Sequence, residues 1–243
     1  MELLLKDFRA FVFARGRQFL EDFIDFISGP KTFLATATVY TAENLARAFS
    51  FFTILYVVVN LLFVFLFPQD VGLEKLVIFN IVYTIVFAGL ALLVLQLCWL
   101  VVGARPPLRR MLLGFLYVVG IGILIQAVFL SAWVMIAHPL DETVAAFDRL
   151  SALEASDPSA AERFLESHPY LMLQVVGLVG AFAAYLLADL AWFIAVWGAF
   201  RQLAATGRVR SGLALILFFT LSLLLFFLSV FFIQAFVPGM TPS

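Results

Sequence analysis

Cysteine, histidine and charged residues are all scarce in this sequence. The only cysteine is Cys98, so one chain can form neither an internal disulfide bond nor a cysteine-based zinc site. Charged residues make up 13% of the 243 residues, which is about half of their usual share in soluble domains. The net charge of −1 argues against a nucleic-acid partner.

Motifs for catalysis and metal binding are absent as well. There is no phosphate-binding glycine loop, no nucleophile elbow and no HExxH motif. The two histidines, His138 and His168, each precede a proline at opposite ends of one loop. If the fold brings the two histidines together, they offer a metal or haem site. Histidines without a neighbouring carboxylate or cysteine ligand are, however, more typical of a membrane interface. We therefore expect no enzyme activity, no metal and no cofactor other than bound lipids.

Apolar residues are abundant, at 64% of the chain, with a mean hydropathy of +1.09. They gather in five runs, each long enough to cross about 30 Å of hydrocarbon as a helix. The sequence predicts an all-α transmembrane bundle with spans near 48–67, 76–102, 111–137, 171–199 and 212–237. Together these form a membrane domain over 48–237, preceded by an arm over 1–47 and followed by a short outer tail over 238–243.

Lysine and arginine predict the orientation of these spans. One side of the membrane receives twelve of them and the other side receives only Lys75, Arg149 and Arg163. By the positive-inside rule the N-terminus is cytoplasmic and the C-terminus extracytoplasmic. The short loops are typical of a bacterial inner membrane.

The N-terminal arm has the pattern of an amphipathic helix lying on the membrane surface. Its apolar face includes Phe8, Phe19 and Phe23, with charged residues roughly opposite. Arg15 and Gly16 interrupt the pattern and predict a break, and Gly29-Pro30 predicts the end of the helix. The arm anchors the chain to lipid or, alternatively, docks a cytoplasmic partner.

The loop over 138–170 predicts an acidic helical hairpin outside the membrane. Asp157-Pro158 has the pattern of an N-cap followed by a first-turn proline. Phe147 and Phe164 are candidate contacts for a partner on this hairpin. The alternative is a solvated cap over the bundle.

Asp189 is the one ionisable side chain deep within a predicted span. A carboxyl group at that depth is costly and marks a functional site by default. It either relays a proton or binds a cation, or it serves as structural glue by hydrogen bonding to polar residues of other spans. The polar candidates on other spans are Asn60, Asn80, Gln96 and Gln126.

Small residues recur at three- and four-residue spacing along the fourth span. Such a ridge lets a neighbouring helix approach closely. Its members are Gly177, Ala181, Ala184, Ala188 and Ala191. Gly114, Gly120 and Gly122 offer the same possibility in the third span.

The layout of the chain resembles the bacterial form of the Yip family of membrane proteins. The resemblance includes Gly29-Pro30-Lys31-Thr32-Phe33 before the first span, Arg109, Arg110, Gly114 and Tyr117 at the third, and Trp197-Gly198-Ala199-Phe200-Arg201 after the fourth. It covers most of 26–237 and rests largely on composition. It implies five spans and a non-enzymatic organiser or adaptor. The Asp-Leu-x-Gly-Pro and Gly-Tyr motifs of the eukaryotic members are absent, so binding of small GTPases is not implied.

Three functional expectations follow. The first is a structural, adaptor or accessory subunit of a larger membrane assembly, with membrane lipids and either other proteins or further copies of the chain as partners. The second is a small transporter or permease subunit with Asp189 in the pathway. The third is a lipid- or pigment-binding protein, which rests only on the 29 phenylalanines.

Overall fold

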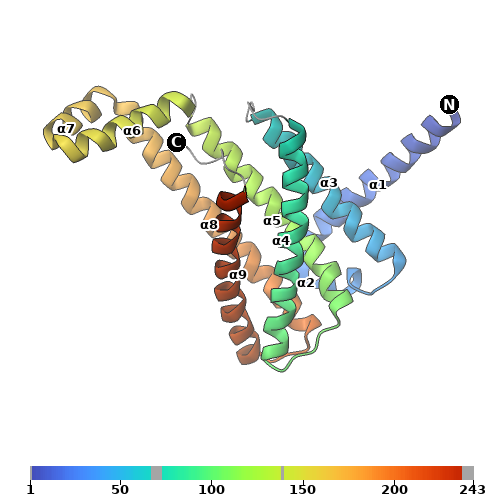
Figure 1. The fold of residues 1–243 in the computed structure, drawn as a ribbon. Coiled ribbons are helices and arrows are strands. Elements are labelled where there is room, and N and C mark those ends of the chain that lie inside the picture. Colours follow the sequence, from blue (N-terminus) through green and yellow to red (C-terminus); the bar gives the residue numbers. More distant parts are fainter. Residues whose placement is uncertain (1, 67–72, 138–139, 237–243) are drawn as a thin grey trace. The chain divides into compact units, whose positions relative to one another are not determined.

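All regular structure in the part of the chain that the computed structural model describes, residues 2–66, 73–137 and 140–236, is helical (Figure 1). In chain order the helices are α1 (Glu2–Ser28), α2 (Pro30–Ala37), α3 (Ala42–Leu66), α4 (Leu73–Val101), α5 (Leu108–Ile136), α6 (Leu140–Ser156), α7 (Pro158–Ser167), α8 (Pro169–Leu203) and α9 (Arg208–Phe236).

Five of these helices, α3, α4, α5, α8 and α9, are long and apolar enough to cross a membrane. The predicted all-α fold with five spans is confirmed to that extent. Each helix begins a few residues before its predicted span, because helical structure continues into the polar flanks. At α3, for example, Thr41 Oγ1 accepts a hydrogen bond from the Asn44 N–H at 3.1 Å and caps a helix that begins at Ala42, six residues before the predicted start.

The predicted break at Arg15 and Gly16 is wrong, since α1 continues through both residues. A single glycine inside a helix costs only about 0.5–1 kcal/mol relative to alanine. Two side-chain pairs one turn apart on the same helix offset that cost: Arg15 donates to Gln18, and Arg17 pairs with Glu21.

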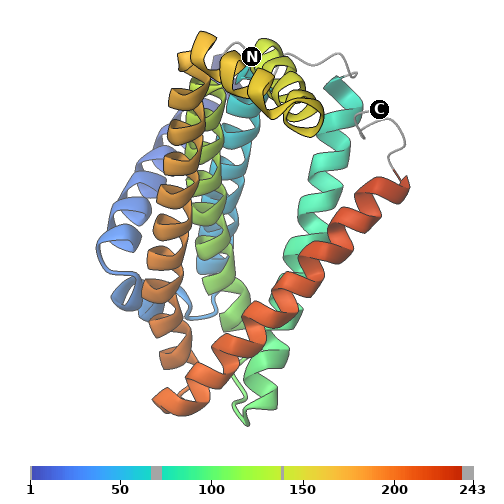
Figure 2. The ribbon, with the colours of Figure 1, turned by 90° about the vertical axis from the view of Figure 1, so that its left-hand side faces the viewer.

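The chain divides into two compact units. Unit 1 comprises Met1–Leu55, Gln69–Gly120 and Phe193–Ser243, and unit 2 comprises Tyr56–Pro68 and Ile121–Trp192. Within unit 1, α4 and α9 pack side by side (Figures 1 and 2). Within unit 2, α6 and α7 pack against each other as a hairpin. The hydrophobic core of unit 1 includes the fully buried Trp99, Tyr117 and Phe26.

Two short connections lie at the same end of unit 1, one between α4 and α5 and the other between α8 and α9 (Figures 1 and 2). We call this end the basic end, because residues 103–110 and 201–210 contain no acidic residue and six arginines. Trp99 and Trp197 stack next to it, with ring centroids 5.0 Å apart. The Trp197 Nε1–H donates to the backbone oxygen and hydroxyl of Ser211 at 3.1 and 3.0 Å, which ties α8 to α9.

Close approach of helices in unit 1 depends on two glycines of α5. A Cβ atom added at Gly120 would lie 3.0 Å from Leu55 and 3.3 Å from Phe51 of α3. One added at Gly114 would lie 3.2 Å from Phe200 of α8. A Cβ at Gly122 would meet no atom within 4 Å, so that glycine leaves open space.

Both helices that lead into the basic end finish with a left-handed residue. After α4 this residue is Gly103, with φ of 81°. After α8 it is Ala205, with φ of 49°, and here the Ala205 N–H donates to Gln202 O while the Thr206 N–H donates to Arg201 O. This pair of bonds is the Schellman arrangement, which strongly favours glycine at the left-handed position. Ala205 therefore carries backbone strain that Gly103 does not.

We expect Ala205→Gly to stabilise the protein by about 1 kcal/mol, because it removes the steric cost of a left-handed Cβ. Thermal unfolding in detergent, followed by tryptophan fluorescence, measures the effect. Ala204→Gly is the matched control; Ala204 is buried and adjacent but has no positive φ, so that change is expected to destabilise. Equal effects of the two substitutions would contradict this account.

Candidate functional site

The best-defined polar site lies where the N-terminal arm meets the first span. Asp22 of α1 is 1% exposed, and Arg47 of α3, 30% exposed, faces it. The Arg47 Nε–H donates to Asp22 Oδ1 and Oδ2 at 2.8 and 2.7 Å, and the second guanidinium nitrogen, Nη2, also donates to Oδ1. The buried carboxylate is thus paired with a guanidinium in the two-donor geometry that arginine favours. This pair joins the arm to α3.

Tyr117 of α5 extends the same junction. Its hydroxyl lies 3.4 Å from Asp22 Oδ2 as a long hydrogen-bond donor. Its ring is surrounded by Phe26, Phe33 and Phe51, with centroids 4.8–5.7 Å away. We call these four aromatic residues together with Asp22 and Arg47 the arm junction. It brings α1, α2, α3 and α5 together around one ion pair.

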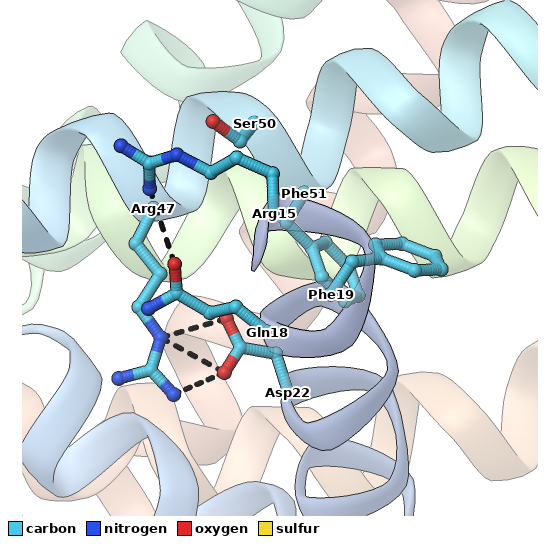
Figure 3. Close-up of a pocket in the computed structure, with 7 residues that line it drawn as sticks. All are labelled: Arg15, Gln18, Phe19, Asp22, Arg47, Ser50 and Phe51. Atoms are coloured by element: carbon cyan, nitrogen blue, oxygen red, sulfur yellow. Dashed lines mark hydrogen bonds and ion pairs between the residues drawn. The ribbon is translucent and has the colours of Figure 1, made fainter. Parts of the chain in front are cut away.

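The arm junction leaves no room for a substrate. A cavity of about 10 Å³ lies beside the ion pair, lined by residues that include Arg15, Gln18 and Ser50 (Figure 3). Such a volume holds about one water molecule. The Asp22 carboxylate is occupied by the Arg47 guanidinium, so the geometry supports a structural role for this site.

Sequence reasoning missed the pairing of Asp22 with Arg47. In the sequence, Arg47 is one of the twelve lysines and arginines that predict the orientation of the spans. A signal was available, because Phe19, Asp22 and Phe26 follow helical spacing and place an acidic residue on an apolar face. A carboxylate in that position requires a cationic partner, although only the fold shows which cation it is.

Asp189 lies near the middle of α8 and is exposed on its surface. No hydrogen bond or ion pair joins it to any side chain that the structure describes. The polar candidates are engaged elsewhere in two cases: Asn60 donates to Tyr56 O at 2.8 Å, and Gln96 donates to Pro106 O at 3.0 Å. Gln126 is exposed, and the side chain of Asn80 lies outside the described residues.

The small-residue ridge of α8 divides into two parts. Gly177 faces α5, since a Cβ added there would lie 3.1 Å from Ile136 Cγ2. Ala181 is half-buried, and Ala184, Ala188 and Ala191 are exposed. Within the residues that the structure describes, the second half of the ridge is therefore exposed.

The proposed partner surfaces also differ in their surroundings. Phe19 packs on Phe51 with centroids 5.2 Å apart, and Phe23 is half-buried beside it. The side chain of Phe8 lies outside the described residues. In the hairpin, Phe147 is half-buried, Phe164 stacks on His168, and the Arg149 guanidinium lies 5.6 Å from the centroid of the Phe164 ring.

Asp157 caps α7, the second helix of the hairpin. Its carboxylate accepts hydrogen bonds from the Ser159 hydroxyl at 2.7 Å and from the N–H groups of Ser159 and Ala160. These bonds, the Ser159 hydroxyl first, lower the pKa of Asp157 from its usual 3.8. At the other end of α7, His168 Nδ1 lies 2.9 Å from Phe164 O. His138 is outside the described residues, so the structure does not show whether the two histidines meet.

Comparison with known proteins adds no relative. The chain matches no protein-family model, no curated protein and no solved structure. Among the residues that the structure describes, no three histidine, cysteine, aspartate or glutamate side chains are grouped to hold a metal ion.

Asp22→Asn is expected to destabilise the protein by about 3 kcal/mol, because it leaves the Arg47 guanidinium unpaired in a partly buried position. The free energy of unfolding in mixed detergent and SDS measures this. Asp25→Asn is the matched control, since Asp25 is exposed on the same helix. The double variant Asp22→Asn/Arg47→Gln should be less destabilised than the sum of its single changes. Additive effects would show that the pair is not coupled.

The cap of α7 predicts a pH dependence. Because the pKa of Asp157 is lowered, its stabilising effect is present at neutral pH and is lost as pH falls through values below 3.8. Amide chemical shifts of Ser159 and Ala160 in the full chain, labelled with ¹⁵N at serine and alanine, should titrate together with a midpoint below 3.8. Asp157→Asn should remove this titration and keep the helix. A midpoint at or above 3.8 would contradict the assignment.

Proposed function

We propose that this chain is a non-enzymatic integral membrane protein of the bacterial inner membrane that acts as an adaptor or accessory subunit of a larger membrane assembly. The observation that carries the proposal is Asp189, a carboxyl group exposed near the middle of an apolar helix. Asp189 lies about 30 Å from the start of α8 and about 21 Å from its end, at 1.5 Å per residue.

A carboxyl group at this depth is unfavourable in lipid. An aspartate at the centre of a spanning helix costs about 2.5–3.5 kcal/mol on insertion scales. The described part of this chain supplies no partner for it. A helix of another protein, or of a second copy, that donates a hydrogen bond to Asp189 would remove this cost. We therefore place the assembly surface on α8.

The exposed half of the small-residue ridge supports an assembly surface on α8. Ala184, Ala188 and Ala191 are exposed on another side of α8, about 100–160° around the helix axis from Asp189 at 3.6 residues per turn. In membranes, helices associate through close packing and interhelical hydrogen bonds, because lipid provides no hydrophobic driving force between them. The exposed alanines offer close packing on one side of α8, and Asp189 offers a hydrogen bond on another side, so the helix presents both kinds of contact to partner helices.

The N-terminal arm has a second role in this proposal, as a helix at the membrane interface. Its described part shows three sides: Asp22 and Phe26 face the arm junction, Leu20 and Ile24 are exposed and apolar, and the remaining side is polar. An exposed apolar side next to a polar one suits the boundary between acyl chains and headgroups. The excess of lysine and arginine supports a cytoplasmic N-terminus.

The resemblance to the Yip family supports the same kind of function, since it implies an organiser without catalytic residues. Two residues quoted for that resemblance, Phe33 and Tyr117, contact each other in the arm junction, with centroids 4.8 Å apart. The contact gives these positions a packing role. The alternative function is transport with Asp189 in the pathway. It predicts that Asp189→Asn loses transport, whereas the adaptor function predicts that Asp189→Asn keeps the assembly, and the experiment below distinguishes the two.

We expect Asp189→Leu and Ala188→Leu to release the chain from its assembly, because the first removes the polar contact and the second blocks close approach. Gel filtration of mild-detergent extracts measures this as a shift of the tagged chain to a smaller size. Asp189→Asn should keep the large form, since an amide still forms hydrogen bonds. Ala183→Leu is the matched control, exposed on another side of the same helix.

Two results would overturn the proposal. The first is a wild-type chain that elutes as a monomer. The second is equal behaviour of Ala183→Leu and Ala188→Leu. If proton or solute flux into proteoliposomes depends on the wild-type chain and is lost in Asp189→Asn, the transport alternative replaces it.

A further inference from the structure

The basic end of unit 1 contains a cavity of about 520 Å³. Residues 103–105, between α4 and α5, form one wall, and residues 204–210, between α8 and α9, form the other. Both walls are fixed by the helix-ending bonds at Gly103 and Ala205, so the cavity is built from defined turns rather than from extended loops.

The charges around this cavity are all positive. Arg105, Arg208 and Arg210 line it, and none of the other seven lining residues is acidic. The sequence has no aspartate or glutamate from 76 to 140 or from 190 to the end. None of the three guanidinium groups forms an ion pair with a side chain that the structure describes. Three uncompensated positive charges around one cavity favour an anion.

Backbone groups add further donors on the same wall. Helix α9 begins at Arg208, and its first N–H groups have no partner within the helix. Gly207 precedes it and has no side chain to cap them. Thr206 also lines the cavity, and its hydroxyl is buried without a hydrogen-bond partner in the described part of the chain. N–H donors, a hydroxyl and arginines together are typical of phosphate recognition.

The surroundings of the cavity are apolar. Val209 lines it and is 79% exposed, and Val101, Leu108 and Leu213 are exposed at the adjoining helix ends. Valine and leucine side chains contribute nothing to binding of a free phosphate ion. They suit the acyl chains of a ligand whose phosphate occupies the cavity.

We propose that this cavity binds the phosphate of an anionic glycerophospholipid, with the acyl chains against the exposed apolar residues beside it. The proposal goes beyond general attraction of basic residues to an anionic membrane, because it assigns the phosphate to three arginines and one helix start. It also stands apart from the adaptor function, since neither Asp189 nor the alanine ridge takes part in it.

The test measures binding of short-chain lipids to the purified full chain in a non-ionic detergent, by isothermal titration calorimetry. The probes are dioctanoyl phosphatidylglycerol, dioctanoyl phosphatidylcholine and inorganic phosphate. We expect the wild type to bind phosphatidylglycerol at least tenfold more tightly than either other probe. Equal binding of phosphatidylcholine would overturn the anion site, and equal binding of inorganic phosphate would overturn the assignment to a lipid.

Two variants test the residues. Arg105→Gln/Arg208→Gln/Arg210→Gln should weaken phosphatidylglycerol binding at least tenfold. The control Arg17→Gln/Arg109→Gln/Arg110→Gln removes the same charge from exposed arginines outside the cavity and should change it less than twofold. If the control loses as much affinity as the cavity variant, general surface charge accounts for the binding and the proposal fails.

Gly207→Asp separates loss of binding from loss of fold. A Cβ at Gly207 meets no atom within 4 Å, so the side chain fits. Aspartate before α9 should cap its N–H groups and stabilise the helix, while its negative charge repels a phosphate. We expect unchanged or higher thermal stability together with loss of phosphatidylglycerol binding. Retained binding in this variant would overturn the site.

Discussion

A buried carboxylate needs a cation within hydrogen-bonding distance, and the arm junction is organised by that requirement. Asp22 is buried, and Arg47 supplies the compensating charge. If the arm left α3, both charges would lose their partner. The ion pair therefore fixes the register of α1 against the first span, and the aromatic rings around Tyr117 pack in the arrangement that this register allows.

The basic end of unit 1 holds six arginines. The stacked pair of Trp99 and Trp197 is tied to Ser211, and the two connections turn immediately beyond it. Rigid turns hold Arg105, Arg208 and Arg210 around one cavity without any acidic residue to neutralise them. The positive charge of this end thus has a defined geometry, which the proposed anion site requires.

The carboxyl group of Asp189 in α8 has different surroundings from that of Asp22 in the N-terminal arm. Asp22 is paired within the chain, whereas Asp189 is exposed among apolar residues with no described partner. The exposed alanines of the same helix lie on another side of it. Spanning helices associate in lipid through hydrogen bonds and through close packing at small residues, and the proposed assembly surface rests on these two features.

The sequence by itself determined the all-helical class and the five long apolar helices, because hydropathy and span length depend only on local composition. Local chemistry also predicted the cap at Asp157. It failed at Gly16, where one glycine costs a helix too little to break it. Only the tertiary structure decided that Asp22 meets Arg47 and Tyr117 and that two distant connections enclose three arginines, since these contacts join residues far apart in sequence whose approach depends on how the helices pack.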